Sequence, residues 1–263
     1  MDETPLLVEL RRGYRVLTFN RPQRLNAFTE SLHQALATAI ADAERDESCR
    51  ALLLTGTGRA FSSGQDLNER IDASGEVAVP GAALEQYYNP LVRKLRALPF
   101  PVVCAVNGIA AGAACNIALA CDIVIAARSA SFLQAFARLG LVPDAGGTWL
   151  LPRLIGQARA RGLALLAEPL SAEKAEQWGM IWKVVDDAAL MVEAEKLCEH
   201  FAQGPTFGFG LIKRALDASE VSDLATQLDL ERDLQRQAGT HPNYAEGVRA
   251  FMQKRKPNFS GKR

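Results

Sequence analysis

Histidine is scarce in this sequence of 263 residues, and all three copies lie outside its glycine-rich segments. A serine or cysteine nucleophile normally needs a neighbouring histidine as its base. The sequence therefore gives little support for a Ser-His-Asp or Cys-His enzyme. We expect His33, His200 and His241 to be surface or structural residues.

Cysteine pairs of the kind that hold metals are missing. The five cysteines form no CxxC motif and have no histidine at ligand spacing, so no metal site is expected. They are Cys49, Cys104, Cys115, Cys121 and Cys198. An odd number of cysteines fits reduced thiols in a cytosol. Cys115 lies near a glycine-rich turn, but a free cysteine more often behaves as a small buried hydrophobe.

Neither positive nor negative charge is in excess, because 30 Lys and Arg residues balance 30 Asp and Glu residues. Such a chain has no overall field to attract nucleic acid or an anionic membrane. The apolar stretch 101–127 is interrupted by Asn107, Asn116 and Asp122, which argues against a membrane span. Residues 1–5 are acidic and lack the order of a signal peptide. We expect a cytoplasmic protein without nucleic acid or membrane partners.

The first half of the chain alternates apolar strands with helices. Four short runs are predicted to be strands: 15–19, 51–55, 102–106 and 123–126. Helices are predicted over 28–45, with Thr29 as its N-cap, and over 111–120. Strands that are continuously apolar and separated by helices are typical of a mainly parallel sheet covered on both faces. The predicted fold class is α/β.

The second half is predicted to be largely helical from Gly156 onward. Ser171 caps a short helix that stops near Gly179, and 184–185 form a brief strand. Three amphipathic helices are expected after it, over 188–202, 206–218 and 222–237.

Three glycine-rich segments carry the chemistry: 59–67, 107–114 and 139–148. In the first two, small residues stand where a strand turns into a helix, so backbone N–H groups are free to meet a ligand oxygen. The third contains Asp144 between an apolar run and a glycine turn. One acid and two sets of N–H donors suit enolate chemistry. The alternatives are purely structural glycine turns and Asp144 as a helix N-cap.

Several segments together resemble the crotonase (enoyl-CoA hydratase/isomerase) superfamily. They are Asn20-Arg21-Pro22, Leu25-Asn26-Ala27, and the stretches 58–67, 101–108, 121–126 and 139–143. The resemblance implies a spiral of strand-strand-helix turns over residues 1–200 and a helical trimerisation region over 201–263. It also implies an acyl-CoA thioester as substrate, no separate cofactor, and a homotrimer or dimer of trimers.

The resemblance also implies roles for individual residues. The oxyanion N–H groups fall on Ser63 and Ala113, and Asp144 falls where isomerases of the family carry their acid. Asn116 and Phe136 stand where hydratases carry two glutamates, so hydration of a double bond is not expected. Contacts with CoA or the acyl group are expected from a further set of residues: Arg24, Ser63, Gly64, Gln65, Asp66, Gly112, Phe136 and Trp149. Tyr87 is a further candidate for shaping the acyl pocket.

Within the family, four segments are most similar to enzymes that isomerise ring-1,2-epoxyphenylacetyl-CoA to its oxepin form: 88–93, 143–152, 178–182 and 226–233. The implied activity is isomerisation of this epoxide, and a shift of β,γ double bonds to α,β as a second activity. Halobenzoyl-CoA dehalogenases also use an aspartate here, but no histidine lies between His33 and His200 to serve as their base. The remaining alternatives are another enoyl-CoA isomerase, a non-catalytic scaffold or an RNA-binding relative.

Overall fold

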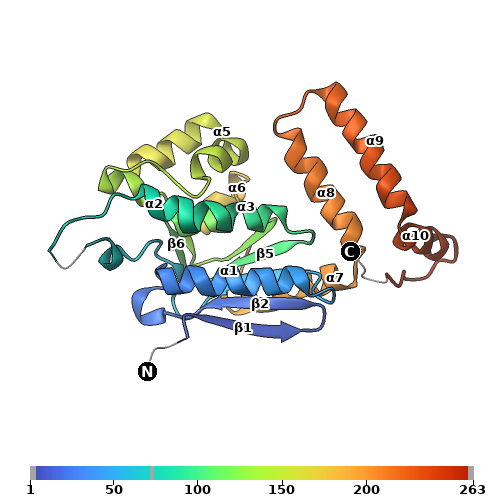
Figure 1. The fold of residues 1–263 in the computed structure, drawn as a ribbon, viewed down its shortest axis with the longest axis horizontal. Coiled ribbons are helices and arrows are strands. Elements are labelled where there is room, and N and C mark those ends of the chain that lie inside the picture. Colours follow the sequence, from blue (N-terminus) through green and yellow to red (C-terminus); the bar gives the residue numbers. More distant parts are fainter. Residues whose placement is uncertain (1–3, 72–73, 260–263) are drawn as a thin grey trace.

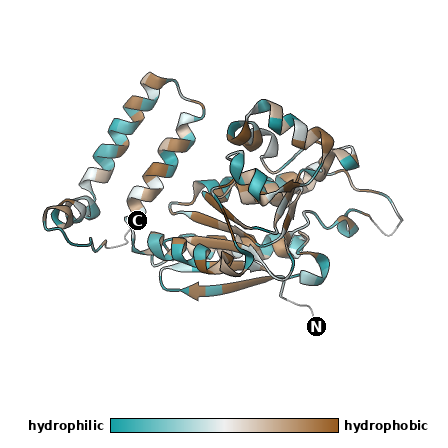
Figure 2. Ribbon diagram, turned by 180° about the vertical axis from the view of Figure 1, so that it is seen from behind, coloured by the Kyte–Doolittle hydropathy of each residue, from teal (hydrophilic) through white to brown (hydrophobic). Residues whose placement is uncertain are grey.

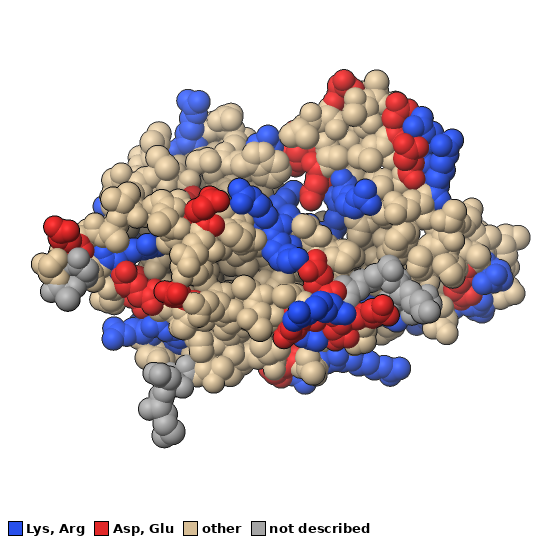
Figure 3. All heavy atoms as spheres, in the orientation of Figure 1, with Lys and Arg blue, Asp and Glu red and all other residues tan. Residues whose placement is uncertain are grey.

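The computed structural model describes residues 4–71 and 74–259. Residues 1–3 of the acidic N-terminus therefore lie outside the described residues. No helix in the described part of the chain is long and apolar enough to cross a membrane. On the face shown in Figure 3, acidic and basic side chains are interspersed over the surface.

A six-stranded sheet forms the centre of the molecule (Figure 1). Its strands, in spatial order, are β1 (Leu6–Arg11), β2 (Tyr14–Phe19), β3 (Leu52–Gly56), β5 (Val102–Val106), β7 (Ile123–Ala127) and β10 (Lys183–Val185). Every neighbouring pair is parallel except β1 with β2. Figure 2 shows the apolar character of these strands, and β5 is buried along its whole length. The predicted α/β class and the four apolar strands are confirmed.

A second sheet of four short strands lies beside the first. It consists of β4 (Ala60–Ser62), β6 (Ile109–Ala111), β8 (Ser131–Leu133) and β9 (Leu170–Ser171). Strands β3, β5 and β7 are each followed within a few residues by a strand of this second sheet. The chain therefore winds as a spiral of strand-strand-helix turns, as the family resemblance implied. The residue pattern alone did not predict these strands, because three residues are too few to show a periodicity.

Helices cover the sheets and fill the connections. Helix α1 (Glu30–Arg45) begins at the predicted cap, where the Thr29 side chain accepts a hydrogen bond from the N–H of Leu32. Ser171 caps α6 (Ala172–Gln177) in the same way. Helix α7 (Leu190–Gln203) packs against strands β2, β3, β5 and β7. The cap residues were predicted correctly because capping depends on local chemistry.

Two helical segments near the glycine turns differ in detail from the prediction. Helix α4 (Ala113–Leu119) is shorter than expected and entirely buried. Helix α5 (Gly147–Leu166) begins well before Gly156, where a positive φ of 77° breaks it into two parts. Between Gly81 and Ala97 the chain forms α2 (Gly81–Ala83), a π-helical turn (Leu84–Tyr88) and α3 (Asn89–Ala97).

The C-terminal helices form an arm that stands away from the sheets (Figure 1). Helices α8 (Thr206–Ser219) and α9 (Leu224–Thr240) are the two predicted ones, and α10 (Pro242–Met252) was not predicted. The arm exposes large apolar side chains, among them Phe251 at 82% and Met252 at 75%. The boundary at residue 200 remains a prediction, because α7 runs to Gln203 while packed on the sheet.

The five cysteines and His33 lie in the protein interior. All five cysteines are buried thiols rather than disulfides. Burial raises the pKa of Cys115 to about 12, so this thiol is no nucleophile at neutral pH. His33 is buried among Phe28, Tyr87 and Tyr88, and burial together with the charge of Arg70 lowers its pKa to about 4. These placements agree with the structural roles expected for them.

Candidate active site

The first glycine turn connects β4 to the short 3-10 helix Leu67–Arg70. Gly64 has a φ of 89°, and a Cβ placed on it would lie 2.8 Å from the carbonyl oxygen of Ala111. Only glycine therefore allows this approach of the two backbones. The N–H of Ser63 donates to the carbonyl of Leu25 at 2.9 Å. The expectation that Ser63 supplies an oxyanion donor is therefore wrong, because its hydrogen is already engaged.

Gln65 supplies the free N–H of this turn. The backbone groups on either side of it are hydrogen-bonded to Phe28. The carbonyl of Gly64 accepts from the N–H of Phe28, and the N–H of Asp66 donates to the carbonyl of Phe28 at 2.9 Å. Within the part of the chain that the structure describes, the Gln65 N–H has no acceptor. The available donor therefore lies two residues beyond the one predicted.

The second glycine turn places Ala113 as expected. Gly112 has a φ of 55° and donates its N–H to Leu133 at 2.8 Å, and α4 begins directly after it. The N–H of the first helical residue has no partner within its own helix, and that of Ala113 meets no acceptor among the described residues. The Ala113 nitrogen is 3.8 Å from a Cβ placed on Gly64. The two turns thus bring the two free N–H groups to one place.

The side chain of Gln65 is held by four hydrogen bonds. Its Nε2 donates to the carbonyls of Phe28 and Asp66, both at 3.1 Å. Its Oε1 accepts from Arg70 and from the hydroxyl of Tyr88, both at 2.9 Å. With both ends engaged, this side chain fixes its own backbone N–H rather than offering a group to a ligand.

Tyr88 and Arg70 are two site residues that the sequence reasoning missed. The prediction named Tyr87, but that ring stacks on His33, whereas its neighbour Tyr88 is buried and reaches Gln65. Tyr88 ends a π-helical turn, and such turns are frequent at functional sites. The residue pattern does not reveal a π-helical turn, so this signal becomes visible only in the structure.

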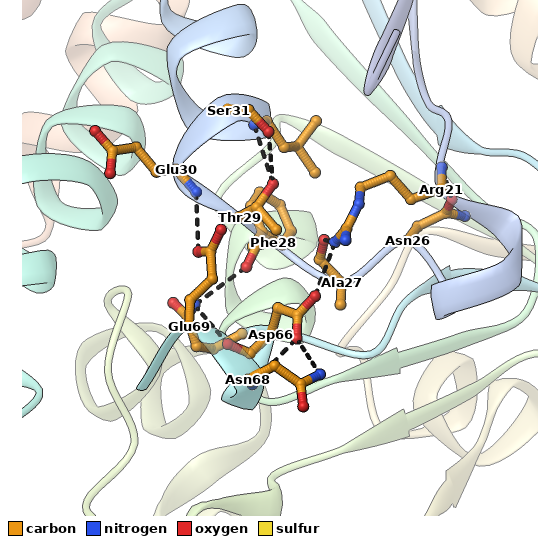
Figure 4. Close-up of polar contacts among 12 residues, drawn as sticks. Arg21, Asn26, Ala27, Phe28, Thr29, Glu30, Ser31, Asp66, Asn68 and Glu69 are labelled. Carbon is orange, nitrogen blue, oxygen red and sulfur yellow. Dashed lines mark hydrogen bonds and ion pairs between the residues drawn. The ribbon is translucent and has the colours of Figure 1, made fainter. Parts of the chain in front are cut away.

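Asp66 stabilises the turn itself. Figure 4 shows its carboxylate between Arg21, at 3.1 Å, and Asn68. Burial raises the pKa of Asp66, but the hydrogen bonds from Asn68 and Arg21 outweigh it and leave the pKa lowered. The Asp66 carboxylate is therefore occupied by hydrogen bonds within the protein. Its surroundings do not support the expected direct contact with CoA.

Asp144 carries a carboxylate without a partner. The residue is half-buried, and its Oδ1 is fully buried with no hydrogen-bond partner among the described residues. Burial raises the pKa of Asp144 to about 6, although the positive charge of Arg70 lowers it. The alternative role as helix cap is wrong, because the N-cap of α5 is Gly146 and no side chain caps it. An unpaired buried acid with such a pKa is suited to proton transfer near neutral pH.

Asn116 holds the turn that contains Asp144. Its Nδ2 donates to the carbonyl of Asp144 at 2.8 Å, and its Oδ1 accepts from Nε2 of Gln134 at 2.8 Å. The residue is completely buried. A neutral amide with both ends occupied cannot carry a proton, which agrees with the expectation that Asn116 is not an acid.

Phe136 lies beside the second glycine turn. The residue is 6% exposed, and its Cζ would lie 3.9 Å from a Cβ placed on Gly112. The ring therefore borders the free N–H of Ala113 and adds apolar surface there. Contact of this ring with the acyl group remains a prediction.

The structure does not bring Trp149 to the site formed by the two glycine turns. Its ring is stacked by the guanidinium groups of Arg96, at 5.0 Å, and Arg153, at 4.1 Å. Arg153 pairs in turn with Glu220 at the end of α8. These contacts put Trp149 at the junction of α5 with the arm, so its expected role in the acyl pocket is not supported.

Arg24 lies at the end of the 3-10 helix Pro22–Arg24 and is exposed. It has no ion-pair partner within the described residues. The side chain is thus available to an external anion. No three His, Cys, Asp or Glu side chains come together as a metal site would require, in so far as the structure describes the chain.

Comparison with known proteins identifies relatives over nearly the full length. The family described as enoyl-CoA hydratase/isomerase matches residues 9–262. A 1,2-epoxyphenylacetyl-CoA isomerase from Escherichia coli (strain K12) is 57% identical over 258 residues, which cover 98% of each chain. A trans-2-decenoyl-(acyl-carrier-protein) isomerase from Streptococcus mutans is 36% identical over the whole of both chains. The crystal structure of an enoyl-CoA hydratase from Bacillus anthracis, 30% identical, superimposes with a TM-score of 0.90 and covers 98% of this chain and 100% of its own.

Proposed function

The chain belongs to the enoyl-CoA hydratase/isomerase family, and we propose that it isomerises acyl-CoA thioesters with Asp144 as the proton carrier. The observation that carries this proposal is the buried Oδ1 of Asp144, which has no hydrogen-bond partner in the described part of the chain. In the reaction the carboxylate removes a proton from the α-carbon of the thioester and returns it further along the conjugated system. Nothing is added or lost, as isomerisation requires.

The charge that develops on the thioester oxygen is stabilised by the N–H groups of Gln65 and Ala113. Neither N–H has an acceptor among the described residues, and the N–H of Ala113 lies at the start of α4, where the helix dipole favours negative charge. Donors that are already in place cost no reorganisation when the enolate forms, and losing one typically costs roughly 10²–10³ in rate.

Isomerisation is favoured over hydration because neither Asn116 nor Phe136, which stand where hydratases of the family carry glutamates, can transfer a proton. Water addition would need groups that activate and place a water molecule. Asn116 is a neutral amide that is fully engaged, and Phe136 is an apolar ring. A single carboxylate remains, and one carboxylate is sufficient for a proton shuttle.

The substrate that we propose is ring-1,2-epoxyphenylacetyl-CoA. The bond between its two oxygen-bearing ring carbons opens to give the seven-membered oxepin ring, and the α-proton taken by Asp144 is returned to a ring carbon, so that no atom is added or lost. Support comes from the relative of that activity, which is 57% identical across 98% of the chain. Phe136 supplies an apolar ring beside the donors, and such rings pack well against a flat acyl group. Because the chemistry is a proton transfer, a shift of β,γ double bonds to α,β in enoyl-CoA follows as a second activity.

Arg24 is proposed to pair with a phosphate of CoA, because it is an exposed and available guanidinium. Arg24→Ala should raise KM for CoA thioesters and leave KM for truncated thioesters unchanged. Equal effects on both substrates would contradict this contact.

A homotrimer or a dimer of trimers is proposed for the assembly. The arm exposes Tyr244, Phe251 and Met252, and an apolar hollow of about 440 Å³ lies between its helices. Exposed apolar side chains that gather on one element are a common feature of interfaces, and they support this proposal. Sedimentation of the purified protein would measure the assembly directly, and a monomer at all concentrations would contradict the proposal.

Proton exchange at the α-carbon of phenylacetyl-CoA in D₂O tests the proposed function. The wild type should catalyse the exchange, and Asp144→Asn should abolish it while CoA binding persists. Conversion of the epoxide by the same two proteins then tests the substrate. If Asp144→Asn exchanged protons at the rate of the wild type, Asp144 would not be the base.

A further inference from the structure

The carboxamide of Asn116 connects the two halves of the proposed site. Asn116 lies one helical turn after Ala113 on α4, so the donor and the amide move as one unit. The amide contacts the turn before α5 by donating Nδ2–H to the carbonyl of Asp144 at 2.8 Å. We propose that Asn116 is a positioning residue that sets the distance between the Asp144 carboxylate and the N–H of Ala113. This inference rests on the proposed role of Asp144.

The orientation of the amide is determined from its other end. Gln134 donates from Nε2 to Oδ1 of Asn116, so the NH₂ group must face Asp144. A side chain at 116 must therefore accept on one side and donate on the other, which an amide does and a carboxylate or an aliphatic group does not. Asn116 is completely buried, so its amide is not exposed to solvent in the folded protein.

Steric fit reinforces the contact. A Cβ placed on Gly147 would lie 2.3 Å from Nδ2 of Asn116, which is too close for any residue but glycine. The N–H of Gly147 also donates to the carbonyl of Asp144, at 2.8 Å. The Asp144 carbonyl is thus held from both sides, and loss of one donor leaves it paired but less well fixed.

Proton transfer is sensitive to such a loss. A displacement of about 1 Å in a catalytic group can cost roughly 10²-fold in rate. For Asn116→Ala we therefore expect kcat to fall by roughly 10- to 100-fold, with KM for the CoA thioester nearly unchanged. The split between kcat and KM separates a positioning role from a loss of substrate binding.

A double variant separates the hydrogen bond from simple packing. Gly147→Ala alone should lower both Tm and kcat, because the methyl group displaces the amide. In combination with Asn116→Ala, the methyl group fills the space that the amide vacated, so Tm should recover while kcat remains low. Recovery of kcat in the double variant would overturn the proposal, because packing alone would then explain the effect of Asn116.

Asn107 provides a matched control. Its amide also bridges backbone groups, donating to the carbonyl of Gly58 and accepting from the N–H of Gly56, but it does not contact the Asp144 turn. Asn107→Ala should lower Tm without changing the pH at which kcat is half-maximal. Asn116→Ala should move that pH, because the surroundings of Asp144 change. If Asn116→Ala behaved as Asn107→Ala does, the positioning role would be wrong.

Titration of the Asp144 carboxyl by NMR, with ¹³C-labelled aspartate, keeps the two proposals apart. This measurement needs no turnover, so a changed pKa of Asp144 in Asn116→Ala supports the positioning role whether or not Asp144 is the base. Active Asp144→Asn would refute the proposed function and the expected fall of kcat in Asn116→Ala, but it would leave the structural claim that Asn116 positions Asp144. An unchanged titration in Asn116→Ala would refute the positioning role alone.

Discussion

Asp122 and Asp144 are two aspartates that differ in the partners of their carboxylate oxygens. Burial raises the pKa of both carboxyls. Asp122, at the start of β7, accepts from the backbone N–H of Val102 and from Nζ of Lys213, both at 2.7 Å. Asp144, before α5, has a buried Oδ1 without any partner in the described part of the chain.

This difference in hydrogen-bond partners separates an aspartate with a structural role from one that is suited to proton transfer. Lys213 comes from α8, so its ion pair with Asp122 attaches the arm to the sheet, and its Nζ also donates to the carbonyls of Leu95 and Phe100. Both donors contact Oδ2 of Asp122, so its negative charge is paired and the position of the carboxylate is fixed. A buried carboxylate oxygen without a partner costs stability, and such a group in a protein is a candidate for proton transfer.

The largest expected effect concerns activity at Asp144. Asp144→Asn keeps the shape of the side chain and removes the base, so kcat should fall by roughly 10²–10⁴-fold. Isomerisation of the epoxide, followed by absorbance or chromatography, measures it. Asp122→Asn is the matched control and should keep its kcat per folded molecule. Comparable losses of kcat in both variants would erase the distinction between the two acids.

The next effect concerns stability at Asp122. Asp122→Asn leaves the ammonium of Lys213, only 9% exposed, without its counter-charge. Because Asp122 keeps 26% of its side chain exposed, we expect a loss of about 3 kcal/mol or somewhat less in urea unfolding. Asp186→Asn breaks the exposed pair with Arg128 and should cost about 0–1 kcal/mol. Equal costs for the two variants would show that the arm junction is not a buried pair.

A smaller effect of opposite sign is expected for the stability of Asp144→Asn. The folded pKa of about 6 lies above the ordinary value, so stability from protonated Asp144 is present at low pH and is lost as pH rises through about 6. The variant avoids this loss and should exceed the wild type at pH 8 by on the order of 1–2 kcal/mol, allowing for solvent screening. At pH 4 the difference should disappear. A variant less stable than wild type at pH 8 would contradict an unpaired carboxylate.

The smallest effect concerns the pH profile. Since the base must be ionised, kcat of the wild type should rise with pH through about 6. The charge of Arg70 lowers the pKa of Asp144, so Arg70→Met should move the midpoint to higher pH, whereas Arg70→Lys should leave it near that of the wild type. The midpoint comes from kcat measured between pH 4 and 9. Equal midpoints in the two variants would mean that Arg70 acts on Asp144 only through its hydrogen bond to Gln65.

The sequence by itself was sufficient where the physical cause is local. Continuous apolar runs predicted β3, β5 and β7, and the chemistry of Thr29 and Ser171 predicted two helix starts. The glycine turn before Ala113 indicated a free N–H, because the first residue of a helix has no partner within that helix. The family resemblance added the spiral and the acid at 144.

Only the tertiary structure decided which groups are free. Ser63 and Gln65 lie in one turn, but the Ser63 N–H is engaged by Leu25, a residue distant in sequence, and the Gln65 N–H is not. Likewise, Tyr88 rather than Tyr87 reaches Gln65, and the Trp149 ring is stacked by the guanidinium of Arg153. Hydrogen-bond partners and ring stacking across the fold are set by long-range packing, which a local pattern of residues does not encode.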